Sequence, residues 1–286
     1  MPDWRGAWQD TALSTEIVWT RLRHRSVDLY ARGTGTWERT SPGSYRAAQR
    51  ALGRRQPVEQ SDRAAVPLPE MGSVVEIDGI RMRIDPRMSE HNIRKLASGR
   101  HTSHERALLK DALQDDDRVL EMGGGIGMVA VDCARRLGGD AVLSFEPSPG
   151  MESLIRDNYA LNGVTPTLKM AMIGETAGHR TFHVAERFSR SSAHVGGEGT
   201  RPVEVPVLAW SDEVAAHRPS VLVCDIQGGE SEFFSHADLA GLRLVLVEIH
   251  LDLLDLRSIA SLKRRIRAQG FDEIGRAGQS FLFCRR

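Results

Sequence analysis

The chain has 286 residues, of which 41% are hydrophobic and 27% are charged, and its 38 basic and 38 acidic residues leave a formal net charge of zero. This composition indicates a globular protein and excludes a disordered chain, and the balanced charge gives no global electrostatic reason to expect a nucleic-acid partner. Because no apolar run is long enough to span a membrane and Cys133, Cys224 and Cys284 are too widely spaced for a disulfide framework or a zinc pattern, we expect a cytoplasmic protein without a membrane partner.

Residues 1–70 differ in composition from the rest of the chain. The first 65 residues contain eleven Arg and no Lys against seven acidic residues. Helices are predicted over Thr15–Tyr30 and Ser44–Leu52, and a proline-punctuated linker is predicted from Gln56 to Pro69. We expect a helical extension that caps the following domain or joins two copies into a homodimer. An RNA- or carrier-binding arm is less favoured, because no aromatic ladder interleaves the arginines.

Residues 71–286 are predicted to form one α/β domain. It opens with a hairpin, in which Ser73–Ile77 and Ile80–Ile84 alternate around an Asp-Gly turn. An amphipathic helix follows over Ser103–Leu113, with Ser103 as its N-cap.

Beyond residue 117, apolar strand segments alternate with helical segments, which predicts a doubly wound, mostly parallel sheet with helices on both faces. The predicted strands are Arg118–Glu121, Ala141–Phe145, Thr167–Met172, Ser220–Asp225, Leu242–Ile249, Phe271–Gly275 and Ser280–Cys284. The predicted helices are Ile126–Leu137, Gly150–Leu161, Glu230–Ser235 and Arg257–Gln269. Two further strands, Arg180–Ala185 and Val203–Leu208, flank a loop rich in Gly and Ser, Ser189–Thr200.

The stretch Val119–Ala130 reads as a buried strand, a glycine turn and the start of a helix. Glycine suits a turn whose backbone lies directly against a ligand, because a Cβ atom would occupy the ligand's space. The turn carries Gly123, Gly125 and Gly127, whereas a dinucleotide fingerprint counted from Gly123 would need its third glycine at Met128. There is also no Gly-Lys-Ser/Thr of a phosphate-binding P-loop. These absences disfavour NAD and nucleoside triphosphates.

Two acidic residues bracket the turn. Glu121 precedes it and suits a cationic ligand group, and Glu146, followed by Pro147, ends the next strand, where a ribose diol can be held. An acid, a glycine turn and a second acid fit S-adenosylmethionine better than NAD. We therefore predict an S-adenosylmethionine site formed by Glu121, Gly123, Gly125, Gly127, Glu146, Pro147 and, at a third strand end, Asp225.

Several motifs taken together resemble the FkbM family of S-adenosylmethionine-dependent methyltransferases, over roughly residues 90 to 286. The motifs are Glu121–Gly127, Phe145–Pro147, Asn158–Asn162, Cys224–Glu230 and Val247–His250, with Gly99–Arg100 and Glu105–Leu109 upstream. The resemblance implies a class I, Rossmann-like fold, with a seven-stranded sheet that ends in an antiparallel hairpin. It also implies methyl transfer to an oxygen, with S-adenosylhomocysteine as the product.

Three positions depart from the pattern of that family. Gln227 stands where the family usually has Glu, Gly125 replaces a usual Asn, and Glu121 replaces the commoner Asp. A neutral amide at position 227 can hold a substrate hydroxyl but cannot accept its proton as a carboxylate would.

An alcohol acceptor loses a proton as it attacks, so a base is needed near the methyl group. The candidates are Asp225, Glu230 and His250, because all lie at or just beyond strand ends that share one edge of the sheet. Glu248 lies two residues before His250 and should point the same way, so that a His–carboxylate pair can form. Gln227, Glu248 and Ser192, the last in a Gly-rich segment suited to a lid, are the predicted substrate-binding residues.

Asp225, Glu230, Glu248 and His250 are also suitable metal ligands by type. No tight ligand spacing supports a metal centre, and we expect none from the sequence. The expected activity is methylation of a hydroxyl on a sugar, a polyketide or another small secondary metabolite. The alternatives are an N-methyltransferase acting on a small amine or peptide, and a non-catalytic S-adenosylmethionine-binding scaffold subunit.

Overall fold

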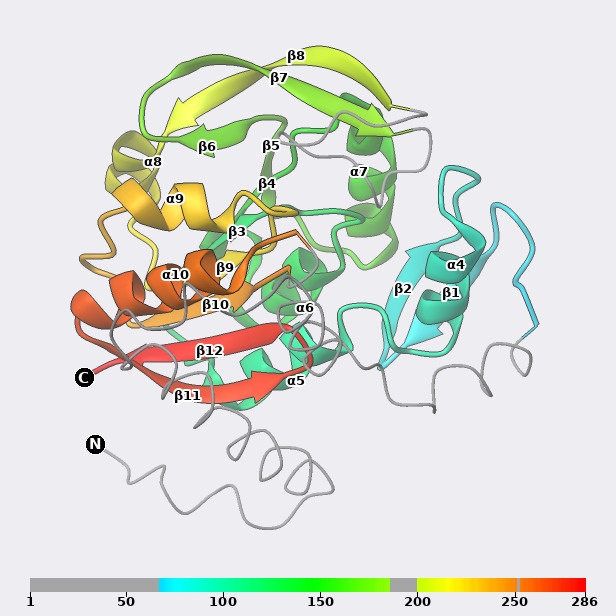
Figure 1. Cartoon of the computed structure of the whole chain (residues 1–286). Coiled ribbons are helices and arrows are strands. Elements are labelled where there is room, and N and C mark those ends of the chain that lie inside the picture. Colours follow the sequence, from blue (N-terminus) through cyan, green and yellow to red (C-terminus); the bar gives the residue numbers. More distant parts are fainter. Residues whose placement is uncertain (1–66, 186–199, 251–252) are drawn as a thin grey trace, which may run out of the picture.

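The computed structural model describes residues 67–185, 200–250 and 253–286 (Figure 1). The helices predicted at Thr15–Tyr30 and Ser44–Leu52, and Ser192 with most of its loop, lie outside the described residues. The expected boundary at residue 70 between an extension and a domain therefore stays a prediction.

Seven strands form the central sheet in the order β11-β12-β10-β9-β3-β4-β5. Their bounds are β3 (Val119–Met122), β4 (Val142–Phe145), β5 (Thr167–Lys169), β9 (Val221–Cys224), β10 (Leu244–Glu248), β11 (Phe271–Ala277) and β12 (Ser280–Arg285). Strand β12 runs antiparallel to both of its neighbours, β10 and β11, and all other adjacent pairs in this sheet are parallel. The expected fold is confirmed as class I and Rossmann-like, doubly wound and mostly parallel, with an antiparallel C-terminal hairpin.

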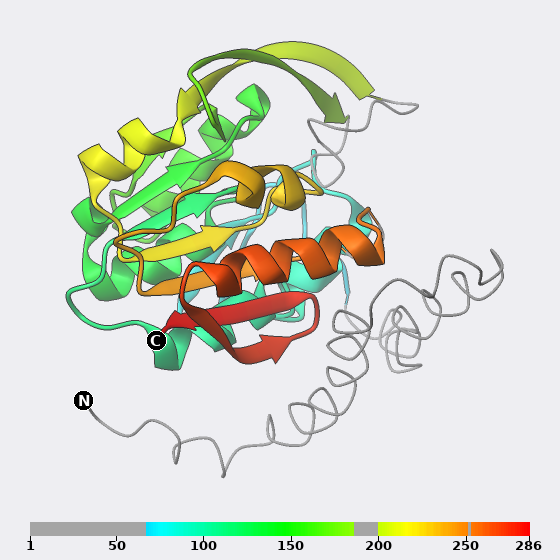
Figure 2. The same ribbon diagram turned by 60° about the vertical axis from the view of Figure 1, so that its left-hand side comes forward.

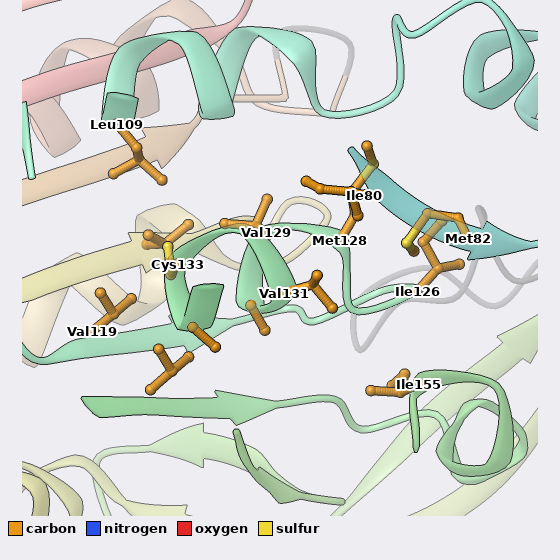
Figure 3. Close-up of a cluster of buried hydrophobic side chains, with 14 of the residues drawn as sticks. Ile80, Met82, Leu109, Val119, Ile126, Met128, Val129, Val131, Cys133 and Ile155 are labelled. Atoms are coloured by element: carbon orange, nitrogen blue, oxygen red, sulfur yellow. The ribbon is translucent and has the colours of Figure 1, made fainter. Parts of the chain in front are cut away.

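Helices cover both faces of this sheet, because successive strand residues point to opposite sides. Val119, Val221 and Leu244 pack on one side with α5 (Ser103–Ala112), α6 (Met128–Leu137) and α7 (Glu152–Leu161). Figure 3 shows part of this core around α6, including Val119, Val129 and Val131. Leu120, Leu222 and Val245 pack on the other side with α8 (Trp210–His217), α9 (Glu230–His236) and α10 (Leu256–Ala268). Burial on both faces explains why these strands read as continuous apolar runs.

The N-terminal part of the described chain supplies a hairpin and two helices. The hairpin of β1 (Val74–Ile77) and β2 (Ile80–Arg83) confirms the prediction. Helix α4 (Glu90–Ala97) was not predicted, although Ser89 caps it by accepting a hydrogen bond of 3.2 Å from the Asn92 N–H. The N-cap predicted for α5 was wrong. Thr102 is the N-cap, because its left-handed backbone (φ +48°) is non-helical and Ser103 is already the first helical residue.

A smaller sheet stands beside the central one, with the order β6-β8-β7. Its strands are β6 (Met172–Gly174), β7 (Gly178–Ala185) and β8 (Thr200–Ala209). In Figures 1 and 2 the β7 and β8 hairpin arches over one end of the molecule. The single strand predicted over Thr167–Met172 was wrong, because a tight turn, in which the Ala171 N–H donates to Lys169 O, splits it between the two sheets.

None of the helices that the structure describes combines the length and the apolar character needed to cross a bilayer. The longest, α10, has 13 residues, against about 20 for a membrane span.

Candidate active site

The glycine turn joins β3 to α6, and its glycines meet different demands. Gly123 has φ +88°, and a Cβ atom built there would lie 1.7 Å from the backbone oxygen of Asp225. Gly127 caps α6 at φ +83°, and a Cβ atom there would lie 2.9 Å from the Tyr159 ring. Gly125 has φ +58°, and a Cβ atom there would have no atom within 4 Å. Close packing explains Gly123 and Gly127, while Gly125 alone of the three faces open space.

Glu146 stands opposite this open position, at the end of β4. Its Oε2 accepts a hydrogen bond of 2.9 Å from the Gly125 N–H, and its Oε1 accepts one of 2.8 Å from the Ser148 N–H. Burial raises the pKa of Glu146, and the hydrogen bonds from the two backbone N–H groups lower it. Burial is the larger effect, and the pKa is about 7. The carboxylate is thus fixed in direction by the glycine turn itself.

Glu121 lies deeper, with 2% of its surface exposed. The Ser144 hydroxyl donates to Glu121 Oε2, from the neighbouring strand β4. Burial raises the pKa of Glu121 to about 7, the Ser144 bond opposes this rise, and the charge of nearby Glu146 adds to it. A cationic group of a ligand near Gly124, which lies between the two acids, would stabilise both in ionised form.

Asp225 ends β9, directly across the edge of the sheet from Gly123. Its N–H donates to Met122 O at 2.9 Å, which ties the ends of β9 and β3 together. Gln227 Nε2 donates to Asp225 Oδ1 at 3.2 Å, and Gln227 itself adopts a left-handed backbone with φ +52°. A non-glycine residue in that region is strained, and such strain gathers at binding sites.

His250 follows β10 and is 8% exposed. Its Nδ1 lies 2.7 Å from Glu230 Oε1, and its Nε2 lies 3.5 Å from Asp225 Oδ1. The sequence suggested Glu248 as the hydrogen-bond partner of His250, but the carboxylate on Nδ1 belongs to Glu230. Because Glu230 also accepts from the Gly228 N–H at 3.1 Å and is 0% exposed, it lies behind the imidazole and orients it.

The charges of this cluster are mutually dependent. Burial opposes a charge on His250, but the Glu230 hydrogen bond and the charges of Asp225, Glu230 and Glu248 outweigh it and raise the pKa of His250 to about 9. Burial also raises the pKa of Asp225 and that of Glu248, and the charge of Asp225 raises the pKa of Glu248 further. This arrangement favours one proton shared between the two carboxyls.

One cavity of about 1380 Å³ brings most of the predicted residues together. The predicted residues that line it are Glu121, Gly123, Gly125, Glu146, Pro147, Asp225, Gln227, Glu248 and His250. Gly127 and Glu230 are not among the lining residues, and Ser192 lies outside the described residues.

Sequence reasoning missed two walls of this cavity. The segment from α4 to α5 contributes Arg100, Thr102 and Glu105, and the smaller sheet contributes Arg180 and Phe182. The hydroxyl of Thr102 is buried without a hydrogen-bond partner, which marks it as a group that a ligand can satisfy. The sequence held two signals for the first wall, the Ser89 N-cap of α4 and the motifs at Gly99–Arg100 and Glu105–Leu109, but neither had been assigned to the site.

The sequence model of a protein family, the methyltransferase FkbM domain, matches residues 123–272 of this chain. No curated protein matches the chain.

Among solved structures, a precorrin-6y C5,15-methyltransferase from Geobacter metallireducens is 13% identical, with a TM-score of 0.38, over 62% of this chain and 83% of that one. A ribosomal protein L11 methylase from Lactobacillus delbrueckii subsp. bulgaricus is 16% identical, with a TM-score of 0.39, over 72% and 86% of the two chains. The tRNA (uracil-54, C5)-methyltransferase of Pyrococcus abyssi, in complex with S-adenosyl-L-homocysteine, is 10% identical, with a TM-score of 0.42, over 75% and 43%. Likenesses this distant carry no argument about the acceptor.

Proposed function

The chain belongs to the methyltransferase FkbM domain family, and from this premise we propose that it methylates a hydroxyl of a small molecule, with S-adenosylmethionine as the donor. The matched residues, 123–272, number 150 of 286 and so make up just over half of the chain. Sugars, polyketides and other secondary metabolites are the proposed acceptors.

The glycine turn and the two acids fit this donor. Gly125 leaves open space against bare backbone, where a side chain would otherwise stand. Glu146, at the end of the strand after the turn, is placed to accept hydrogen bonds from the ribose hydroxyls. Glu121 contributes negative charge toward a cationic ligand that carries both a sulfonium and an amino group. When bound, the cofactor supplies the electrophilic methyl group.

The acceptor is proposed to lie near Asp225, on the other side of Gly123. In the transfer, the hydroxyl oxygen forms a bond to the methyl carbon, the carbon–sulfur bond breaks, and its electron pair stays on sulfur. The hydroxyl proton passes to the carboxylate of Asp225, which His250 and Gln227 hold in place. Glu230 acts through His250, as a positioning residue.

One observation carries the proposal: the Gly125–Glu146 edge and the Asp225 carboxylate line the same cavity. This shared cavity supports the proposal, because an in-line methyl transfer requires the donor and the proton acceptor to meet in one space.

Calorimetric titration of the full chain with S-adenosylmethionine tests the donor subsite. We expect saturable binding that Glu146→Ala weakens about 10- to 100-fold, because charge-assisted hydrogen bonds contribute about 1.5–3 kcal/mol. Glu232→Gln, which removes an acid that lines the same cavity and pairs with Arg180, is the control and should leave the affinity unchanged. Absence of binding would refute every enzymatic version of the proposal.

Methyl transfer to matched hydroxyl and amine acceptors then decides the acceptor atom. Transfer to alcohols that Asp225→Asn abolishes supports the proposal. Transfer only to amines would favour the N-methyltransferase, since a neutral amine already has its lone pair. Binding without transfer to either set would favour a scaffold subunit.

The cytoplasm is the proposed location, because the three cysteines, all among the described residues, are free thiols. A homodimer through residues 1–70 is also a proposal, and the measured mass of the full chain in solution tests it.

A further inference from the structure

Three potential metal ligands meet at the carboxyl ends of β9 and β10. One ligand atom each from Asp225, Glu248 and His250 can be chosen so that all lie within 4.8 Å of one another. These residues are 23 and two positions apart in the sequence, which is why no ligand motif is visible there. All three line the cavity in which the acceptor is proposed to bind.

The imidazole is turned so that its second nitrogen faces the carboxylates. Since Glu230 is a carboxylate only 2.7 Å from Nδ1 of His250, that nitrogen carries the hydrogen and donates it. In the neutral ring, Nε2 then presents a lone pair toward Asp225 Oδ1, 3.5 Å away. A lone pair facing carboxylate oxygens is repulsive unless a positive charge stands between them.

Within the described part of the chain, no Arg or Lys forms an ion pair with Asp225 or Glu248, and Glu105 adds a further acid close to both. A proton on His250 Nε2 or a bound cation can supply the positive charge. The carboxylate–imidazole arrangement of Glu230 and His250 is the one by which proteins orient a metal-binding histidine.

We propose that Asp225, Glu248 and His250 bind a divalent cation of the Mn²⁺ class, with its open coordination positions facing the acceptor. Two carboxylate oxygens and one imidazole nitrogen suit such a borderline-hard ion. Glu230 does not ligate it and instead fixes the ring of His250.

This inference rests on the proposed function and deepens it. A cation held by these residues would lower the pKa of the acceptor hydroxyl and so would ease the loss of its proton. The O–H bond breaks, and the proton goes to a carboxylate oxygen of Asp225 or Glu248 that does not ligate the cation. The new O–CH₃ bond then forms as the S–CH₃ bond breaks, with its electron pair left on sulfur.

Electron paramagnetic resonance of Mn²⁺ tests the site without relying on activity. The full chain is stripped with EDTA, dialysed and titrated with Mn²⁺, and loss of the signal of aqueous Mn²⁺ reports binding. We expect one saturable site. Glu230→Gln should weaken it about tenfold, as outer-shell changes do, and Glu248→Gln and His250→Gln should weaken it further. Glu232→Gln removes a carboxylate from the same cavity without touching the cluster and should change nothing.

Titration of each variant with S-adenosylmethionine shows that it is folded, since none of the four substitutions changes a residue of the predicted donor site. The absence of saturable Mn²⁺ binding in the wild type, or equal binding in all four variants, overturns the proposal. Methyl transfer that survives chelation undiminished also overturns it, while leaving the proposed function intact. If the wild type binds Mn²⁺ but not S-adenosylmethionine, the metal site stands and the proposed function falls.

Discussion

Gly123 and Gly125 lie two positions apart in one turn but are constrained by different neighbours. A Cβ atom at Gly123 would lie 1.7 Å from the Asp225 backbone oxygen, whereas one at Gly125 would enter the open cavity. Backbone cannot give way as a flexible side chain can, so the first position is set by the fold. Gly125 has no such neighbour, and its open position is the one that the proposed ligand would occupy.

Alanine at each position should separate these demands. Gly123→Ala should destabilise the protein by several kcal/mol, since overpacking adds to the left-handed backbone cost of about 1–2 kcal/mol. Gly125→Ala should incur only that backbone cost, while weakening S-adenosylmethionine about tenfold or more by occupying its space. Urea unfolding and calorimetric titration measure the two effects. Equal affinity in Gly125→Ala and the wild type would show that the ligand does not approach this backbone.

Glu146 predicts how donor binding depends on pH. Its pKa in the folded protein is about 7, so the carboxylate that is proposed to accept ribose hydrogen bonds is lost as the pH falls through 7. Affinity for S-adenosylmethionine should therefore decrease about tenfold from pH 8 to pH 6 through this group. Titration calorimetry at several pH values measures it. Glu146→Gln should remove this part of the dependence, and Glu121→Gln should retain it.

The raised pKa of Glu146 affects the stability of the fold in the opposite direction: stability decreases as the pH rises. Between the ordinary pKa of a glutamate, 4.5, and the raised pKa of about 7, the folded state holds a proton on Glu146 that the unfolded state has released. The contribution of this carboxyl to the free energy of unfolding therefore falls as the pH rises through that window. Glu121 behaves in the same way, with a pKa of about 7. The buried acids thus cost stability at neutral pH, a cost that a bound cationic ligand would offset.

At the scale of elements, helix α4 and the turn that leads into α5 build the wall facing the glycine turn. The helix has eight residues, too short to be stable alone, so its cap and its buried residues Ile93 and Leu96 must hold it. The wall is therefore only as well ordered as these few contacts make it.

Ser89→Ala should loosen this wall. Loss of the hydrogen bond from the Asn92 N–H should cost about 1 kcal/mol and speed amide hydrogen exchange within α4. Exchange measured by mass spectrometry, region by region, is the readout. Ser211→Ala is the matched control, since Ser211 is exposed on α8 and caps no helix. Protection of α4 equal to that of the wild type would mean that packing alone orders the helix.

At the scale of the whole molecule, the two ends of the parallel strands contribute differently: one end carries the cavity, and the other stabilises the fold. The carboxyl edge carries the cavity. At the opposite edge Asp117 is 3% exposed, and it accepts hydrogen bonds from Arg243 Nε at 2.7 Å and from Ser220 Oγ at 2.6 Å. These contacts join the starts of β3, β9 and β10, far in the chain from one another but adjacent in the sheet.

Arg243→Met should therefore destabilise the fold without altering donor affinity. It leaves the Asp117 carboxylate buried without its cation, which costs about 3–5 kcal/mol in comparable cases. Chemical denaturation measures the stability, and calorimetry on the folded fraction measures the affinity. Arg286→Met, which removes an ion pair whose side chains are 63% and 61% exposed, should cost under about 1 kcal/mol. A large loss of affinity in Arg243→Met would contradict the separation of the two edges.

Much of the fold could be predicted from local sequence pattern. Apolar runs, the Asp-Gly hairpin and the glycine turn located the hairpin, the seven strands of the central sheet and the helices between them, because period and turn chemistry are properties of adjacent residues. The parallel order then placed Glu121, Glu146, Asp225 and His250 at one edge, where the structure has them lining one cavity. Local pattern did not predict that Thr167–Met172 divides between two sheets, nor that helices α4 and α8 form. The conformation of such short segments depends on the surfaces against which they pack.

The sequence by itself determined the fold class and the edge of the sheet at which chemistry can occur. Only the tertiary structure decided that Glu230 rather than Glu248 hydrogen-bonds to His250, that the Asp225 backbone excludes a side chain at Gly123, and that Asp225, Glu248 and His250 lie close together. The physical reason is distance along the chain. Glu230 and His250 are 20 residues apart, and Gly123 and Asp225 are 102 apart. Contacts across such separations depend on how strands and helices pack, and not on the local pattern of either partner.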